Sequence, residues 1–329
     1  MITEATQYTK CKKDYKLVSQ VIQLLKLQNL REQRWISGGD QKYVNLVCGV
    51  REHSSTFPCS WCDLAASAFR DRPAYNLRTF GGIRRCNADR LAAHGRRAEP
   101  KYHLSVKEDP ALPCEDKKRV IECVIPPELH FLLRAFNHIW ENLGKAWQRA
   151  INATENPAWQ FAISVNPVPS TYHGQDFKGD ACCRLLKSID KLEAAVPPTM
   201  GLPFVKCLRD LNTVVVSCFS VAGPPPDYLA HLPYHSSSAL PDVSFTTTLH
   251  GIVEHTRDFF EIWGTEFGLG LYGEQAGESV HFDFENRIYT HAYKRPECHP
   301  EFGPLLLRAV AHYNAIHLNT VPRSPPDEE

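Results

Sequence analysis

The sequence predicts an α+β protein that is mostly helical. Apolar residues recur at helical spacing in most segments after residue 128, and strand candidates are confined to the first third of the chain. Hydrophobic residues make up 43% and charged residues 22%, an ordinary balance for a globular protein. At 329 residues the chain is long enough for two domains, or for one core that carries a large insertion.

The expected elements begin with a helix over residues 15–30. Residues 43–47 suit either a short strand or a buried helix, which periodicity does not separate. Residues 51–115 are irregular, and residues 120–124 read as a short strand stopped by Pro126 and Pro127. Because proline suits the first turn of a helix, a long helix is expected next. The helices expected from there on cover residues 128–148, 181–195, 203–221, 245–263, 272–289 and 302–318, before a disordered tail.

Composition and charge exclude several classes of protein. No apolar run approaches a membrane span, and the first 16 residues lack the pattern of a signal peptide. We therefore expect an intracellular, non-secreted protein whose 12 cysteines stay reduced. The net charge of zero hides an asymmetry, since residues 1–150 carry +9 and the remainder −9. The basic excess is concentrated in residues 70–101, which indicates either contact with a polyanion or a plain solvated loop.

The clearest chemical motif is PCSWC, where Cys59 and Cys62 have the spacing of two thiolates that share one tetrahedral zinc ion. A thioredoxin-like pair has the same spacing but requires a β-α-β pattern that the sequence does not offer. His250 and His255 in LHGIVEH could supply the other two ligands. On an ideal helix they lie about 140° apart, so the helix must begin, end or bend there. Core cysteines and two histidines on a partly buried helix are the alternative, and the residues alone leave it open.

Two further patterns could bind a phosphate group or a metal cation. GLGLYG at residues 268–273 matches G-x-G-x-x-G, but a predicted helix precedes it, so we expect a turn and no nucleotide cofactor. Glu274 and Glu278 lie one helical turn apart and could face one site, although an exposed acidic face is the common alternative. Asp40 follows two glycines, a position where an aspartate usually belongs to a turn.

Taken in order, Gly-Asp-x-Lys, Cys-x-x-Cys, a Leu-His helix, His-x4-His and Glu-Ser resemble the catalytic core of Transib-type transposases and of the recombination-activating protein of V(D)J recombination. The resemblance covers residues 36–317. It implies a partial ribonuclease-H-like core with a large helical, zinc-tied insertion. It places structural Zn²⁺ on Cys59, Cys62, His250 and His255, and two of the family's three metal-binding acids on Asp40 and Glu278. The implied divisions are a core segment (1–50), a basic zinc-binding and helical insertion (51–244), helices bearing zinc ligands and the glutamate (245–318) and a tail (319–329).

The resemblance also implies a function. The family cleaves DNA and transfers strands with two divalent ions held by three acids. The family's first acid has no counterpart in the 39 residues before Asp40, so we expect an N-terminally truncated relative that is inactive as given, with Mg²⁺ or Mn²⁺ bound only if the site is active. The alternative is a zinc-stabilised, non-catalytic DNA- or protein-binding module domesticated from such an element. The implied location is nuclear, a homodimer is left open, and DNA is the expected partner, with phosphate contacts from Arg84, Arg85, Arg96 and Arg97.

Overall fold

The structure is a computed structural model that describes residues 15–24, 37–51, 54–165, 176–227, 240 and 243–272. All of these lie in one compact unit, Lys13–Glu274. They are mostly helical, as the sequence predicts. Within these ranges, paired extended backbone is limited to isolated bridges such as Ser37 with Val124 and Cys62 with Leu77. The ribonuclease-H-like core stays a prediction.

The α-helices have the following bounds: α2 Tyr15–Leu24, α3 Gln41–Val47, α4 Phe80–Ala92, α5 Glu128–Ala150, α6 Pro157–Val165, α7 Gly179–Leu186, α8 Ile189–Ala195, α9 Pro198–Cys218, α12 Thr247–His250, α13 Thr256–Trp263 and α14 Leu269–Tyr272. Short 3₁₀ turns connect some of them: η2 Ala66–Ala68, η3 Gly95–Ala98, η4 Pro100–Tyr102 and η5 Val120–Glu122. Between α12 and α13 the chain is π-helical over Gly251–His255, labelled η6.

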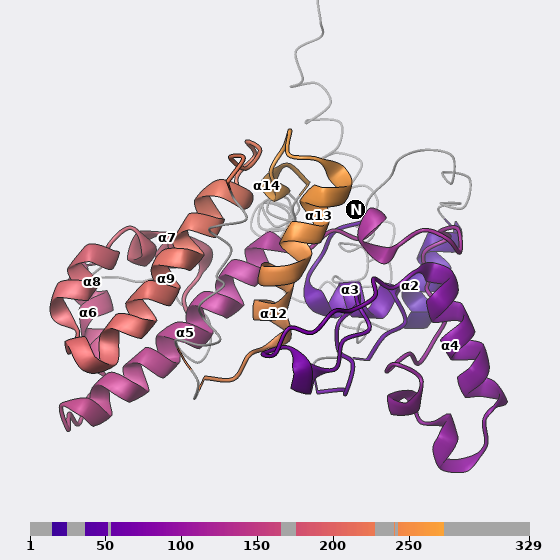
Figure 1. The fold of residues 1–329 in the computed structure, drawn as a ribbon, viewed down its shortest axis with the longest axis horizontal. Helices are drawn as coiled ribbons and strands as arrows, with labels where there is room; N and C mark the ends of the chain where they lie inside the picture. The colour runs from indigo at the N-terminus through magenta and orange to yellow at the C-terminus, as the bar shows by residue number, and fades with distance from the viewer. Residues whose placement is uncertain are drawn as a thin grey trace, which may run out of the picture. The chain divides into compact units, whose positions relative to one another are not determined.

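The long helix α5 organises one group of helices. It begins directly after Pro126 and Pro127, as predicted, and buries an apolar stripe that includes Phe131, Phe136 and Leu143. This stripe packs against α9, α6 and α7, while α8 lies against α9 (Figure 1). The stretch expected as one helix over residues 181–195 is two helices, because the backbone leaves the α-helical region at Ser188, where φ is −100° and ψ is 15°.

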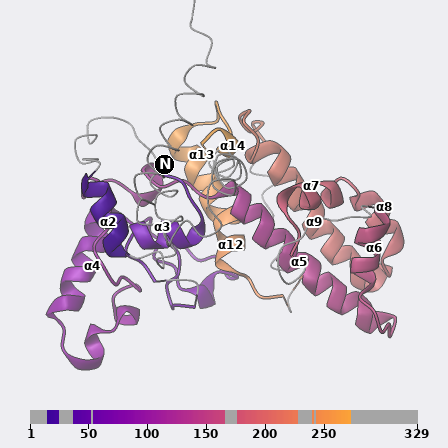
Figure 2. The ribbon, with the colours of Figure 1, turned by 180° about the vertical axis from the view of Figure 1, so that it is seen from behind.

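A second group contains α2, α3, α4 and the loops between them. The continuous helix formed by α12, η6 and α13 runs between the two groups in both views (Figures 1 and 2). Its first part contacts α5 and its last part contacts η5. No helix of the described ranges is long and apolar enough to cross a bilayer.

Three local expectations are resolved in the first third of the chain. Residues 43–47 belong to helix α3. The strand predicted over residues 120–124 is wrong: the segment turns tightly, with Cys123 and Val124 both donating backbone hydrogen bonds to the Val120 carbonyl, at 3.0 and 2.8 Å. Helix α4 lies in the stretch expected to be irregular. Only Phe80, Gly81, Ile83 and Asn87 of its 13 residues are buried, so it carries almost no apolar period.

Candidate metal centre

The loop that carries Cys59 and Cys62 is held in place by its own backbone and by the residues between the cysteines. Cys62 forms an extended bridge with Leu77. The hydroxyl of Ser60 donates to the Asn45 side chain on α3 at 2.6 Å. The indole of Trp61 is fully buried and donates to the Val124 carbonyl at 2.7 Å. Both cysteine side chains therefore face inward at fixed positions, with no exposed surface.

The two histidines lie on the continuous helix at its π-helical turn. Thr256 donates its backbone N–H to the carbonyl of Gly251, five residues earlier, which is the hydrogen bond of a π-helix. The wider turn brings residues five apart to the same side of the helix. The rings of His250 and His255 lie 4.8 Å apart between centroids and at 88° to each other. The bend that the 140° separation requires is this π-helical turn, a feature often found at functional sites.

The structure brings the four predicted donors together. The Cys59 sulfur lies 3.0 Å from Nε2 of His255, and the Cys62 sulfur lies 3.2 Å from Nε2 of His250. All four donor atoms lie within 4.8 Å of one another, although 188 residues separate Cys62 from His250. A tetrahedral ion with ordinary bond lengths places sulfur and nitrogen about 3.6 Å apart. The cluster therefore fits a single metal ion if the two sulfur–nitrogen distances of 3.0 and 3.2 Å lengthen slightly.

The pKa values of the four donor side chains are shifted in different directions, so the four groups differ in protonation. Burial opposes ionisation of the Cys59 thiol, yet hydrogen bonding from Cys62 and the charge of His255 hold its pKa well below its usual range. The pKa of Cys62 is raised by its hydrogen bond to Cys59 and by burial. Burial lowers the pKa of His250. For His255 the effect of burial is outweighed by the Cys59 thiolate and by Asp258, which raise its pKa to about 10.

Asp258 orients one of the histidines from outside the cluster. It lies on the next turn of the helix, and its Oδ2 lies 2.8 Å from Nδ1 of His255. The same oxygen accepts a hydrogen bond from the hydroxyl of Tyr75 at 2.8 Å. A carboxylate on the far nitrogen of a ligating histidine fixes the ring and leaves Nε2 directed at the metal. This support follows from the i, i+3 spacing of the two residues, a sequence signal that the predicted ligand set does not include.

His250 is held by stacking instead. Its ring lies parallel to that of Phe69, with centroids 4.1 Å apart and planes within 4°. Its Nδ1 is buried and has no hydrogen-bond partner among the described residues. Tyr75 meets both imidazole rings edge-on, and Trp61 lies against His255. These aromatic side chains give the cluster an apolar wall that excludes water.

A buried arginine lies directly behind the thiolates. The Nε of Arg78 donates to the carbonyls of Cys59 and Cys62, at 3.0 and 2.7 Å, and one terminal nitrogen donates to the Leu104 carbonyl at 2.8 Å. Burial lowers the pKa of this guanidinium, while the two nearby sulfur charges oppose the effect. Arg78 therefore shapes the Cys-x-x-Cys turn and places a positive charge beside it.

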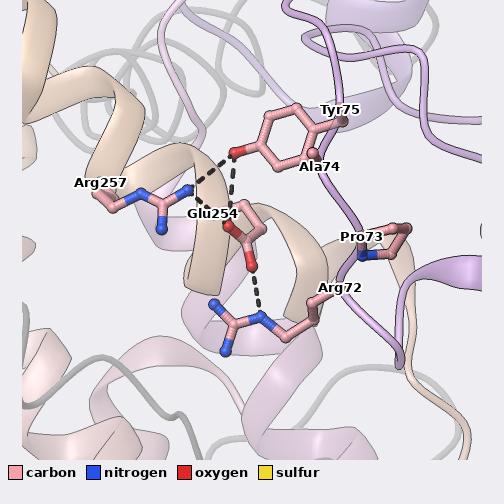
Figure 3. Close-up of a pocket in the computed structure, with 6 residues that line it drawn as sticks. All are labelled: Arg72, Pro73, Ala74, Tyr75, Glu254 and Arg257. Carbon is pink, nitrogen blue, oxygen red and sulfur yellow. Dashed lines mark hydrogen bonds and ion pairs between the residues drawn. The ribbon is translucent and has the colours of Figure 1, made fainter.

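A pocket of about 300 Å³ opens beside the cluster (Figure 3). Glu254 lies at its centre and accepts from Arg72 at 2.5 Å and from Arg257 at 2.8 Å. The Tyr75 hydroxyl points toward the same carboxylate, at 3.4 Å. Residue 72 comes from the cysteine-bearing loop and residue 254 from the histidine-bearing helix. The Arg72–Glu254 ion pair thus joins the two segments that carry the metal donors, whereas Arg257 and Glu254 lie on the same helix.

Of the two predicted catalytic acids, the structure describes one. Asp40 is the N-cap of α3, and its Oδ1 accepts the backbone N–H of Tyr43 at 2.6 Å. It lies three residues after Ser37, which pairs with Val124 in an isolated extended bridge. Glu278 and its rival Glu274 lie outside the described residues. The same holds for the helix predicted over residues 302–318 and for all but the first residue of the helix predicted over residues 272–289.

The four predicted phosphate-binding arginines divide into two kinds. Arg84 forms an ion pair with Asp116 and donates to the Cys114 carbonyl at 2.9 Å, so its guanidinium stabilises the loop. Arg85, Arg96 and Arg97 are exposed, and their side chains carry no ion pair within the described part of the chain. These three remain available to an outside anion.

The glycines of the GLGLYG segment allow close backbone packing. Gly268 and Gly270 donate their N–H groups to the carbonyls of Val221 and Ser220, at 3.0 and 3.1 Å. A Cβ at either glycine would come within 2.5 Å of a backbone oxygen of residues 219–222. Both amides are therefore bonded within the chain, whereas a phosphate-binding loop directs its amides at the ligand.

Neither a protein-family model nor a curated protein matches the chain.

Proposed function

We propose that the chain is a zinc-stabilised DNA-binding protein of the transposase and recombinase type. The observation that carries this proposal is the convergence of Cys59, Cys62, His250 and His255. Two short motifs 188 residues apart meet in one buried cluster, which is the arrangement that the resemblance implies. Groups so distant in sequence rarely meet by chance with all four donor atoms facing one point.

Zinc is the ion that this donor set favours. Two thiolates and two imidazoles in a tetrahedral array suit Zn²⁺, and the close approach of all four donors leaves room for one ion. Each of the four side chains is fully buried, so the site has no open position for water or substrate. Closed sites of this kind are structural, whereas catalytic zinc keeps one position free.

The ion would tie together two parts of the chain that the Arg72–Glu254 ion pair and the Tyr75–Asp258 hydrogen bond also join. One pair of ligands lies on a loop with little regular structure, and the other lies on the helix that packs against α5 and η5. A metal that binds only the folded chain stabilises it by about 4 kcal/mol when free metal exceeds its dissociation constant a thousandfold. This contribution holds the basic segment after the loop at a fixed place relative to the helix.

DNA is the partner that the surface charge supports. Arg85, Arg96 and Arg97 lie within one stretch of 13 residues on α4 and the turn after it, and their side chains have no ion pair in the described ranges. Lysine and arginine side chains that neutralise phosphates release counterions, which makes binding weaken with salt. Such contacts carry no sequence preference of their own.

The assignment of Asp40 and Glu278 as metal-binding acids belongs to the same proposal. Mg²⁺ bound by one or two carboxylates keeps several waters and is held weakly. Two-metal cleavage needs a third acid to bridge the ions, and this sequence offers no match to it. We therefore expect the 329-residue chain to bind DNA without nicking it in Mg²⁺ or Mn²⁺.

The test is binding of a fluorescent DNA duplex across a range of salt concentrations. The variant with Arg85, Arg96 and Arg97 all changed to Gln should bind more weakly, and its log–log salt slope should fall by about 2 to 3. Arg209→Gln is the matched control, because Arg209 is paired with Asp190 and Glu193 on the α8–α9 helices. An unchanged slope in the triple variant would remove DNA contact from the proposal. Metal-dependent nicking that is lost in Asp40→Ala would show that the chain is active.

A further inference from the structure

An exposed aromatic ring directly follows the basic segment of residues 70–101. Tyr102 ends the turn η4 and is 60% exposed, so the described helices and loops leave most of its surface uncovered. It follows η3, which carries Arg96 and Arg97, and the two turns are hydrogen-bonded in series: Glu99 donates to the Arg96 carbonyl and Tyr102 to the Glu99 carbonyl. The ring and the two guanidinium groups therefore belong to one short, folded segment.

One face of the Tyr102 ring is already occupied. The ammonium of Lys101 lies 5.0 Å from the ring centroid, within the range of a cation–π contact. Lys101 is itself held by Glu99 at 3.0 Å. The ring is thus oriented by its neighbours while most of its surface stays open to solvent. An aromatic side chain fixed in this way loses little conformational entropy when a flat partner stacks on it.

The segment is also anchored to the metal-binding loop. Leu104 and Ser105 have φ angles of 50° and 59°, the left-handed region that non-glycine residues adopt only when other contacts hold them. Arg78, which shapes the cysteine turn, donates to the Leu104 carbonyl at 2.8 Å. Phe57 donates its N–H to the Ser105 hydroxyl at 3.0 Å. The turn that presents Tyr102 is therefore fixed by the same loop that carries two of the metal donors.

We propose that this segment binds unpaired nucleotides of DNA, with a base stacked on Tyr102 and the flanking phosphates held by Arg96 and Arg97. The inference rests on the DNA-binding function proposed above and adds that this segment prefers single-stranded DNA. Proteins that bind single strands combine a basic track with aromatic side chains on which bases stack, because every base offers a flat face. In paired DNA the bases are stacked on each other, so the ring of Tyr102 would have no partner.

The experiment compares binding of a 20-nucleotide oligo(dT) and a 20-base-pair duplex at one salt concentration. Tyr102→Ala should weaken binding of the single strand by about 5- to 150-fold, which corresponds to one lost base stack, and should leave duplex binding nearly unchanged. Tyr102→Phe keeps the ring and should bind the single strand like the original chain. Phe267→Ala removes another exposed aromatic ring and serves as the control.

The outcomes separate this inference from the function on which it rests. If the chain binds neither oligo(dT) nor duplex, the DNA-binding proposal fails. If it binds both, and Tyr102→Ala lowers neither affinity or both equally, DNA binding stands and the stacking role of Tyr102 is refuted. Thermal unfolding of Tyr102→Ala should match that of the original chain, because an exposed ring contributes little to folding.

Discussion

Replacing Asp258 by Asn should weaken metal binding without disturbing the shape of the site. The carboxylate of Asp258 accepts from His255 at 2.8 Å and from Tyr75 at 2.8 Å, and asparagine keeps its volume while removing the charge. Loss of a carboxylate behind a ligating histidine typically costs 10- to 100-fold in metal affinity. We therefore expect the zinc dissociation constant of Asp258→Asn to rise by about this factor, or roughly 1.4 to 2.7 kcal/mol.

The assay is competition for zinc with a chromophoric chelator of known affinity. Glu261→Gln is the control, because Glu261 lies on the same helix, is 59% exposed and has only a 3.7 Å contact to Arg257. Tyr75→Phe removes the hydroxyl that bonds to Asp258 and should weaken zinc binding less. Because Tyr75 acts through Asp258, the Tyr75→Phe change should add little in the Asp258→Asn background. Equal zinc affinity in Asp258→Asn and the original chain would refute the orienting role of this carboxylate.

Two further predictions concern protons and packing. Metal coordination requires thiolates and neutral imidazoles, so the raised pKa values of Cys62 and His255 mean that zinc binding at pH 7.5 should release about two protons. Because protons compete with the metal, the zinc affinity should fall by about 100-fold for each pH unit that the pH is lowered. Calorimetry in buffers of different ionisation enthalpy measures the number of protons released on zinc binding. A binding enthalpy that does not depend on the buffer would contradict the assignment. Gly251→Ala should destabilise the fold by about 1 to 3 kcal/mol and weaken zinc binding, because the added methyl would lie 2.3 Å from the Phe131 ring inside the π-helical turn. Denaturant unfolding measures the change in the free energy of unfolding. Gly179→Ala is the control, because its added methyl in helix α7 would meet only one side chain, at 3.3 Å. Equal stability of the two variants would show that the π-helical turn tolerates a side chain at residue 251.

The sequence predicts those parts of the structure that depend on local chemistry. The start of α5 follows from Pro126 and Pro127, and its length follows from an apolar stripe that repeats at helical spacing. The spacings Cys-x-x-Cys and His-x4-His indicate candidate metal donors, because ligation favours such spacings, and the family resemblance combines the two pairs into one site. In both cases the signal lies within a few neighbouring residues.

Other features depend on contacts that a linear pattern does not contain. The π-helical turn at Gly251–His255 depends on packing, where a glycine without Cβ lies against Phe131. Helix α4 was missed because only four of its 13 residues are buried and they form no clear apolar stripe, although Thr79 caps the helix by accepting the N–H of Gly82 at 3.0 Å. The pairing of Arg84 with Asp116 spans 32 residues, so the sequence pattern does not show that one of the four predicted DNA-contacting arginines has a partner within the chain.

The most direct test of the central claim is the X-ray absorption spectrum of the purified, zinc-loaded chain, together with its zinc content. The account predicts one zinc per chain, with two sulfur ligands at about 2.3 Å and two nitrogen ligands at about 2.0–2.1 Å. The variant Cys59→Ser with His250→Gln should lose the bound zinc. A first shell of nitrogen and oxygen without sulfur, or full zinc retention in that double variant, would contradict the assignment of Cys59, Cys62, His250 and His255 as the metal site.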